Sequence, residues 1–479
     1  MSLNGTPKRI KVIGGGLAGP EAALQAASRG CEVALFEMRP RRSTEAHQTT
    51  DFAELVCSNS LKSESEFSAP WLLKQEMRQA GSFLLKAADA TAVPAGHALA
   101  VDRAEFSRHV AERIAAEPRI TVHREEVTSL EEVDPHTITI LASGPLTSAP
   151  LAAELQRLTG AEHMAFYDSI SPIVDATTID MEKVYFAARW DKGTADYINC
   201  PFTKEEYERF LDALTSAEKI EAKAWEELPA DGRPEHLAID PEAPSSALFS
   251  PPPAPETLQY FEGCLPIEET ARRGRDTLRF GPMKPAGLTN PKTGRWPYAA
   301  VQLRQENLRA DSYNIVGFQN HLKIGEQARV LRMIPGLEHA AFLRFGQIHR
   351  NTYIHAPSLL AETLQLRTHA NILIAGQLSG VEGYTESIAS GLLAGRYAAA
   401  LAHGEQPAPA PAPRLSANGS LTHYITHAET KRFQPANITF DLLPPLEDDL
   451  RKRIRDKKAR HQLQCERALE AWSAWLALG

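Results

Sequence analysis

The most constraining feature of the sequence is a glycine-rich turn between two apolar segments near the N-terminus. Strand-like residues 10–13 precede the turn, a small-residue helix follows it, and a second strand-like segment, 33–36, ends at Glu37. The turn carries a G-x-G-x-x-G pattern over Gly14, Gly15, Gly16, Leu17, Ala18 and Gly19. In such a turn the first glycine permits a tight bend, the second lets the backbone approach a pyrophosphate, and the third lets the helix pack on the strand. The stretch therefore predicts a dinucleotide-binding βαβ unit, with phosphates at the helix N-terminus and Glu37 placed to accept from ribose hydroxyls.

Two later glycine turns favour FAD over a nicotinamide nucleotide. Strand-like residues 371–374 run into Gly376-Gln377, and Gly383-Tyr384 then opens a long small-residue helix over 385–402. FAD domains commonly end in this way, with the helix N-terminus directed at the cofactor. The alternative is simply another βα unit of the same sheet. The candidate cofactor-binding residues are Gly14, Gly15, Gly16, Leu17, Ala18, Gly19, Glu37, Arg39, Gly144, Gly376, Gln377, Gly383 and Tyr384.

The composition narrows the class of protein only moderately. The 479 residues suffice for roughly two or three domains. A net charge of −8 gives no global nucleic-acid signature, although a local basic face stays possible. The five cysteines form no C-x-x-C pair, which argues for a reducing compartment without a disulfide framework. Because no apolar run approaches the ~20 residues that cross a bilayer, we expect a cytoplasmic protein without a membrane partner.

The pattern of apolar residues predicts the main elements between these turns. A strand is expected over 93–101, further strands over 120–122 and 137–141, and adjacent strands over 301–304 and 313–318. Helices are expected over 71–80, 103–115, 204–225 and 324–333. A basic cluster at 451–460 is typical of a solvated helix face, and it is also a candidate for contact with RNA phosphates.

Several longer motifs occur in order along the chain. They are GGGLAGPEAALQAASRG, TEAHQTTDFAELVCSNSLKSES, AVPAGHALAVDR, FEGCLPIEETARRG, FGPMKPAGL, MIPGLEHA, HRNTYIHAP and AGQLSGVEGYTESIASGLLAG. The first resembles both families of bacterial FAD-dependent tRNA-modifying enzymes. As a set, the motifs resemble the folate- and FAD-dependent tRNA (uracil-5-)-methyltransferases.

This resemblance implies an α/β fold, with a Rossmann-like FAD-binding domain of the two-dinucleotide-fold type and an inserted α+β domain. The expected division is an FAD-binding first part at 1–160, an inserted domain at 161–300 with a Pro-rich excursion at 229–257, an FAD-binding second part at 301–405, and a Pro/Ala spacer with a basic tail at 406–479. The implied reaction forms 5-methyluridine at position 54 of the tRNA T-loop from 5,10-methylenetetrahydrofolate, with NADPH or NADH as reductant. The oligomeric state stays open.

Two cysteines fall in motifs of this family. Uracil C5 is a poor nucleophile until a thiolate adds to C6, so the reaction needs a thiolate, a base and a flavin beside a folate. The resemblance assigns Cys264 as the nucleophile, while Cys57 is expected against the flavin or as the base. Each thiol needs a positive neighbour to be largely ionised, because an ordinary cysteine has a pKa near ~8.5.

The remaining assignments concern folate, RNA and metal. His349 and Asn351 are the expected folate wall, with Lys284 in the same pocket, although a polar turn before Pro357 is the alternative. The expected phosphate contacts are Arg272, Arg273 and Arg275. No metal site is expected, because the histidines look scattered without ligand spacing.

Three other functions compete with this one. They are a related enzyme that modifies the tRNA wobble uridine, an FAD-containing RNA-binding protein without catalytic duty, and an NAD(P)H-dependent flavin oxidase. The presence of both Cys57 and Cys264 argues against the RNA-binding protein without catalytic duty.

Overall fold

The computed structural model describes residues 9–44, 46–130, 137–160, 164–220, 265–404, 410–429 and 433–478, with the backbone alone at 164–169 and 348–350. Cys264 and the expected Pro-rich excursion at 229–257 lie outside the described residues.

The larger unit is built on a six-stranded sheet with the order β16-β17-β7-β1-β2-β6. Its strands are β1 (Arg9–Ile13), β2 (Val33–Phe36), β6 (Ile120–His123), β7 (Thr137–Leu141), β16 (Gln365–Leu366) and β17 (His369–Ile374). All neighbours are parallel except β16, which is antiparallel to β17. Both faces are covered, so strand residues such as Val12 and Ile140 are fully buried. This is the expected Rossmann-like α/β arrangement, and the late glycine turn follows a strand of the same sheet as β1.

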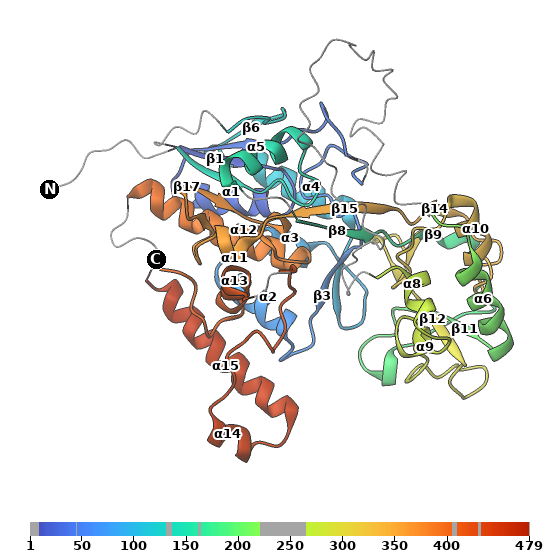
Figure 1. The fold of residues 1–479 in the computed structure, drawn as a ribbon. Helices are drawn as coiled ribbons and strands as arrows, with labels where there is room; N and C mark the ends of the chain where they lie inside the picture. Colours follow the sequence, from blue (N-terminus) through green and yellow to red (C-terminus); the bar gives the residue numbers. More distant parts are fainter. Residues whose placement is uncertain are drawn as a thin grey trace, which may run out of the picture.

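Two helices from opposite ends of this unit pack closely on the sheet. They are α1 (Ala18–Ser28) and α12 (Tyr384–His403), which lie side by side (Figure 1). Gly391 and Gly395 face α1, where an added Cβ would lie 2.3 Å from the carbonyl oxygen of Ala18 or 2.4 Å from that of Ala22. The other elements around them are α2 (Ala69–Gln79), α3 (Phe83–Ala90), α4 (Arg103–Ala115), α5 (Ala149–Thr159), α11 (Ala356–Leu359) and η4 (Gln377–Ser379).

A three-stranded antiparallel sheet, β3-β5-β4, lies beside the larger one. Its strands are β3 (Ser60–Ser63), β4 (Ala92–Val93) and β5 (Ala98–Val101). The prediction of one strand over 93–101 is wrong, because the chain turns back after Val93 and pairs β4 with β5. Pro94 has no backbone N–H to donate, and Gly96 adopts a φ of +58°, so both residues suit a turn.

The smaller unit contains a six-stranded sheet with the order β10-β11-β12-β13-β9-β14, in which every pair of neighbours is antiparallel. Its strands are β9 (Ile173–Asp175), β10 (Tyr185–Phe186), β11 (Ile198–Phe202), β12 (Ala299–Gln305), β13 (Ser312–Ile315) and β14 (Phe342–Arg344). Its helices are η1 (Ala176–Thr178), η2 (Arg189–Asp191), α6 (Lys204–Ser216), α8 (Ile267–Arg272), α9 (Thr277–Phe280) and α10 (Ile324–Leu331). It forms the green and yellow part of Figure 1.

Two expectations for this unit need correction. The division expected between 300 and 301 falls inside β12, and strands as late as β14 pair within this second sheet. Apolar strand patterns identify strands but not the sheet they join, so this boundary could not be found from periodicity. The helix expected over 204–225 begins with a capping box at Thr203 and Glu206 but ends at Ser216, and residues 221–225 lie outside the described part.

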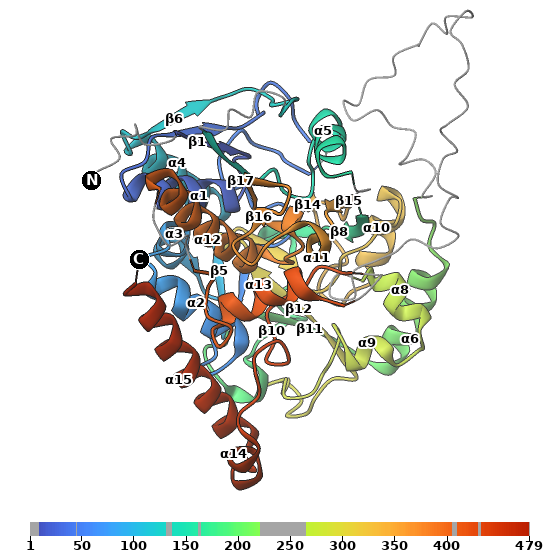
Figure 2. The same ribbon diagram turned by 60° about the vertical axis from the view of Figure 1, so that its left-hand side comes forward.

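The two units are joined by backbone and by buried side chains. The antiparallel pair β8 (Met164–Ser169) and β15 (Ile348–Tyr353) runs between them (Figures 1 and 2). The fully buried Asn59 donates from Nδ2 to the carbonyl of Gln305 at 2.9 Å and accepts at Oδ1 from Nε of Arg304 at 2.9 Å. The end of β12 is thereby fixed against the chain that follows Cys57.

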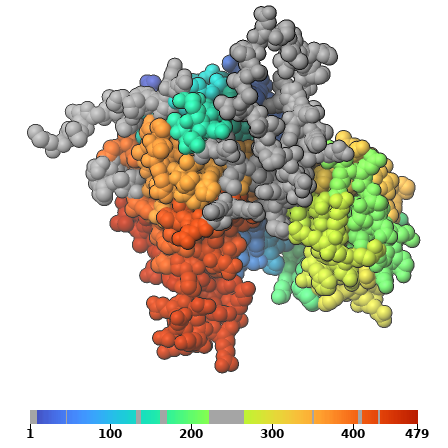
Figure 3. Space-filling model, in the orientation of Figure 1, coloured from blue at the N-terminus to red at the C-terminus, as the bar shows by residue number. Residues whose placement is uncertain are grey.

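The C-terminal residues form helices on the outside of the larger unit. They are α13 (Ala417–His427), α14 (Asp448–Arg453) and α15 (Lys457–Leu476); α13 packs in the body of this unit, whereas α14 and the adjoining end of α15 project from it (Figures 1 and 3). The buried Trp472 of α15 donates from Nε1 to the carbonyl of Glu76 in α2 at 2.7 Å. The basic cluster is divided between α14 and α15, because Asp456 caps a new helix. Among the described residues, none of the helices has the length and apolar character required to cross a membrane.

The close contact between α1 and α12 makes a prediction about stability. We expect Gly395→Ala to destabilise the protein by about 1–3 kcal/mol, because its Cβ would overlap backbone rather than a movable side chain. The matched control is Gly325→Ala in α10, where nothing lies within 4 Å of the added Cβ, and a stabilisation of about 0.5–1 kcal/mol is expected. Scanning calorimetry measures both, and equal melting temperatures for the two variants would contradict the packing argument.

Candidate active site

A large cavity opens where the glycine turns of the larger unit meet. Its empty space is about 1030 Å³ when the open solvent at its mouth is included. The turns after β1, β7 and β17 all contribute, because the carboxyl ends of parallel strands share one edge of the sheet. The lining includes these sequence-predicted residues: Gly14, Gly15, Gly16, Leu17, Ala18, Glu37, Arg39, Gly144, Gly376, Gln377 and Tyr384.

Each of the three fingerprint glycines is required for a different structural reason. Gly14 has a φ of +116°, and a Cβ there would lie 2.3 Å from the carbonyl oxygen of Ala142. A Cβ on Gly19 would lie 1.8 Å from the carbonyl oxygen of Gly14. Gly16 lines the cavity, yet its added Cβ would meet nothing within 4 Å. Packing therefore accounts for the first and third glycines, whereas a side chain at Gly16 would fill space that a bound group requires.

Glu37 is held by its own neighbours at the cavity wall. Its Oε2 accepts from the N–H of Gly15 at 2.8 Å, and its Oε1 accepts from N and Nε of Arg39 at 2.9 and 2.8 Å. Burial opposes ionisation, but the hydrogen bonds and charge of Arg39 and the N–H of Gly15 outweigh it, so the pKa of Glu37 is lowered. Arg39 also pairs with Glu54 at 3.0 Å. A carboxylate has about four acceptor positions, so Glu37 keeps roughly one for a ligand hydroxyl.

Tyr384 positions the loop that carries Cys57. The phenol stands at the first residue of α12, and its oxygen accepts from the N–H of Cys57 at 2.6 Å and from that of Ser58 at 3.3 Å. Burial raises the pKa of Tyr384, so the phenol stays neutral. Val56 lines the cavity, and the next residue is the half-buried Cys57. The cysteine loop is thus tied to the helix whose N-terminus faces the cavity.

Two cations that sequence reasoning missed act on Cys57. Arg103 and Arg344 are both within electrostatic range of its thiol. Burial opposes the charge of Arg103, but the ion pair with Glu306 at 2.6 Å outweighs this effect and raises the pKa of Arg103. Burial and the nearby Arg103 lower the pKa of Arg344, which donates to the carbonyl of Ala46 at 3.1 Å. Arg103 and Arg344 are far apart in the sequence, and only the fold brings both of them near Cys57.

The other cysteines of the described chain have different surroundings. Cys31, Cys200 and Cys465 are fully buried. Burial raises the pKa of Cys200 and raises that of Cys465 to about 12, so both thiols stay protonated. Both therefore pack as small apolar residues. Cys264, the expected nucleophile, lies outside the described residues.

The expected folate residues are only partly brought together. His349 and Asn351 both belong to β15, and the neighbouring Thr352 donates from N to the carbonyl of Pro145 in the cavity wall at 2.9 Å. Asn351 is buried, and among the described residues no donor reaches its Oδ1. Lys284 is exposed in the smaller unit and does not line the cavity.

The remaining predicted residues lie outside the cavity. Gly19 packs against Gly14, and Gly383 has a φ of +106° at the start of α12, where a Cβ would meet Lys62. The expected RNA contacts Arg272, Arg273 and Arg275 are exposed in the smaller unit. Arg275 pairs with both Glu208 and Asp212, and Arg272 lies 3.4 Å from Glu269, so carboxylates already offset part of this charge.

The expectation that the histidines lack ligand spacing is wrong. His423 and His427 lie one turn apart on α13, and Glu362 lies beside them. The His-x-x-x-His spacing is visible in the sequence. Glu362, however, is distant along the chain, and only the fold brings it close to the two histidines.

The comparisons with known proteins agree with this architecture. The model of the family described as glucose inhibited division protein A matches residues 9–232 and 253–406. Two structures of Aquifex aeolicus GidA, in crystal forms II and I, share the fold with a TM-score of 0.66 at 16% identity, covering 98% and 99% of this chain and 74% and 77% of theirs. The fold and cavity thus define a GidA-like flavoprotein architecture.

Relatives with higher sequence identity identify the family more specifically. The chain is 62% identical to a Koribacter versatilis (strain Ellin345) protein over 98% of both chains, and 58% identical to a Solibacter usitatus (strain Ellin6076) protein over 97% of this chain and 98% of that one. Both are named methylenetetrahydrofolate–tRNA-(uracil-5-)-methyltransferase TrmFO. The chain belongs to the TrmFO family.

The cationic surroundings of Cys57 make a prediction about its reactivity. We expect Arg344→Met to slow alkylation of Cys57 by iodoacetamide about tenfold at neutral pH, because losing one nearby cation raises a thiol pKa by about one unit. Peptide mass spectrometry counts Cys57 separately from Cys264. Arg309→Met is the control, since that side chain is 82% exposed and pairs with Asp311. An unchanged rate at Cys57 in Arg344→Met would exclude the cation as its activator.

Proposed function

We propose that this protein is an FAD-dependent methyltransferase that forms 5-methyluridine at position 54 of the tRNA T-loop. The carbon comes from 5,10-methylenetetrahydrofolate, and NADPH or NADH is the reductant. The observation that carries the proposal is the junction of the cavity with the Cys57 loop, held by Tyr384. Two relatives at 62% and 58% identity are named methylenetetrahydrofolate–tRNA-(uracil-5-)-methyltransferases, which supports the folate donor, the tRNA substrate and methylation at uracil C5.

The cavity residues suit FAD. The open space at Gly16 and the N-termini of α1 and α12 provide backbone N–H groups and positive dipole ends for a pyrophosphate. Glu37 stays ionised and is oriented by Arg39, so it can accept from a ribose hydroxyl. When bound, the flavin would supply the redox chemistry that turns a methylene into a methyl group.

The cysteines have separate proposed duties. Cys264 adds to uracil C6, which makes C5 nucleophilic, and leaves after the C5 proton is removed. Cys57 lies beside the cavity under the influence of Arg103 and Arg344, which favour its thiolate and allow it to act as a base. His349 and Asn351 on β15 pass close to the same cavity wall and are proposed to hold the pterin.

The smaller unit offers a surface for RNA. Trp190 and Trp296 are about half exposed, at 53% and 50%, and their rings lie edge to face with centroids 5.0 Å apart. The exposed Lys284 is close, because its carbonyl accepts from Arg189, the residue before Trp190. Exposed aromatic rings beside cations suit unstacked bases and phosphates, and we propose that this face, with Arg272 and Arg273, contacts the T-arm.

The decisive experiment combines the purified protein with undermodified tRNA, methylene-labelled folate and NADH or NADPH, followed by nucleoside analysis. We expect labelled 5-methyluridine at position 54. Cys264→Ala should lose at least ~10³-fold in rate, because it removes the nucleophile. Cys465→Ala, in a buried site away from the cavity, is the control and should stay active. Label at the wobble uridine instead would favour the related wobble-modifying activity, and full activity of Cys264→Ala would remove that thiol from the mechanism.

The contacts of Glu37 predict that its substitution weakens cofactor binding. Glu37→Gln removes the ion pair with Arg39 and presents a neutral amide, so we expect FAD to bind about 10–100-fold more weakly. Flavin absorbance of the purified protein and a titration of FAD into stripped protein measure this change. Glu32→Gln is the matched control, because Glu32 is exposed just before β2. Equal flavin content in both variants would remove Glu37 from the cofactor site.

A further inference from the structure

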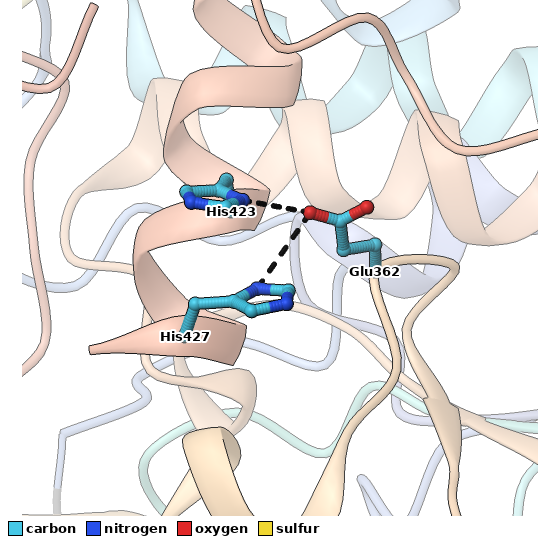
Figure 4. A group of neighbouring side chains, drawn as sticks. All are labelled: Glu362, His423 and His427. Carbon is cyan, nitrogen blue, oxygen red and sulfur yellow. Dashed lines mark hydrogen bonds and ion pairs between the residues drawn. The ribbon is translucent and has the colours of Figure 1, made fainter. Parts of the chain in front are cut away.

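A compact group of three metal-ligand side chains lies outside the flavin cavity. His423 and His427 project from one face of α13 with nearly parallel rings, and both point toward the carboxylate of Glu362 (Figure 4). Nδ1 of His423 lies 2.8 Å from Oε1 of Glu362, and Nδ1 of His427 lies 3.6 Å from the same atom. One ligand atom from each residue lies within 4.8 Å of the others. We propose that these three side chains bind a zinc ion, with water as the fourth ligand.

The distances suit this ion. Zinc bonds to nitrogen and oxygen are ~2.0–2.1 Å long, so neighbouring ligands of a tetrahedral site lie about 3.3 Å apart. The observed separations of 2.8 and 3.6 Å bracket this value, so small side-chain movements suffice. Two imidazoles with one carboxylate favour zinc over magnesium, which prefers oxygen ligands.

The surroundings leave room for the ion and a water. The three side chains are 38%, 46% and 35% exposed for His423, His427 and Glu362, so solvent reaches the group from outside. In the structure Nδ1 of His427 lies 2.9 Å from Oγ1 of Thr426. That hydroxyl also donates to the carbonyl of Thr422 at 2.8 Å, so it keeps a partner when zinc takes the imidazole. Arg414 is in electrostatic range of Glu362, so its charge partly opposes a bound cation.

The position indicates what zinc would do. Glu362 lies between α11 and β16, the edge strand of the large sheet, whereas the histidines lie near the end of α13. A shared ion would therefore tie the C-terminal helices to the sheet that forms the flavin cavity. With three protein ligands and an open position, the site belongs to the same coordination class as zinc sites that bind water. Its proposed role is to cross-link two segments that are far apart in the sequence.

Zinc chloride titrated into the chelator-stripped full chain tests this site, with bound metal counted by mass spectrometry after dialysis. We expect wild type to bind one zinc ion more than the double variant His423→Ala/His427→Ala. Glu362→Gln should bind that ion at least about 100-fold more weakly, because mutating even a residue that only hydrogen-bonds to a metal ligand typically lowers metal affinity 10–100-fold. The control is His369→Ala, a half-buried histidine beside Thr368, which should match wild type.

Two further readouts separate this site from zinc bound by cysteines or from damage to the fold. Zinc should raise the melting temperature of wild type but not of Glu362→Gln, which keeps the size of the side chain. Cobalt in place of zinc should give a spectrum of nitrogen and oxygen ligands. Equal zinc affinity and stoichiometry in wild type and Glu362→Gln would overturn the proposal. So would a cobalt spectrum that shows only a thiolate charge-transfer band and is unchanged in the double histidine variant. If the double variant does not fold, the comparison with Glu362→Gln decides alone.

Discussion

The close packing of α1 against α12 is the contact on which the cavity depends. The two helices come from residues 18–28 and 384–403, at opposite ends of the larger unit. Only glycine at positions 391 and 395 lets the two backbones approach so closely, because a Cβ would overlap carbonyl oxygens of α1. This approach brings both helix N-termini to one edge of the sheet. The cavity therefore needs both halves of the chain and cannot form from the N-terminal fingerprint alone.

A second constraint couples the cysteine loop to the smaller unit. The amide of Asn59 is saturated by Val101, Gln305 and Arg304, and Arg103 pairs with Glu306 at the end of β12. Leaving such buried groups unpaired costs roughly 1–3 kcal/mol each, so the joint holds the two units in one arrangement near Cys57. Tyr384 also fixes this loop, by accepting from two of its backbone N–H groups. The position of the thiol is thus determined by the meeting of three segments, rather than by its own loop.

Features that depend on residues close together in the sequence could be predicted, whereas contacts between distant segments could not. The fingerprint, the late glycine turn and the helix at 103–115 follow from local patterns, and the described residues confirm them. The hairpin after Val93 was missed because alternation continues through a turn that only Pro94 and Gly96 mark. The cations near Cys57 and the partner of the two histidines come from distant segments, and no local period encodes such pairs.

The charges around the cavity restrict how a dinucleotide can be recognised there. Four carboxylates line it, at Glu37, Glu54, Glu125 and Glu126, and the arginine among the lining residues, Arg39, is already paired with two of them. Phosphate charge must therefore be met by backbone N–H groups and helix dipoles, since Arg39 is the sole lysine or arginine among the described residues that line the cavity. Such recognition suits a ligand whose few phosphates are joined to hydroxyl-rich sugars, because the carboxylates can accept from the hydroxyls. A densely charged free polyphosphate would face the same carboxylates without that compensation, so the lining itself selects for a dinucleotide.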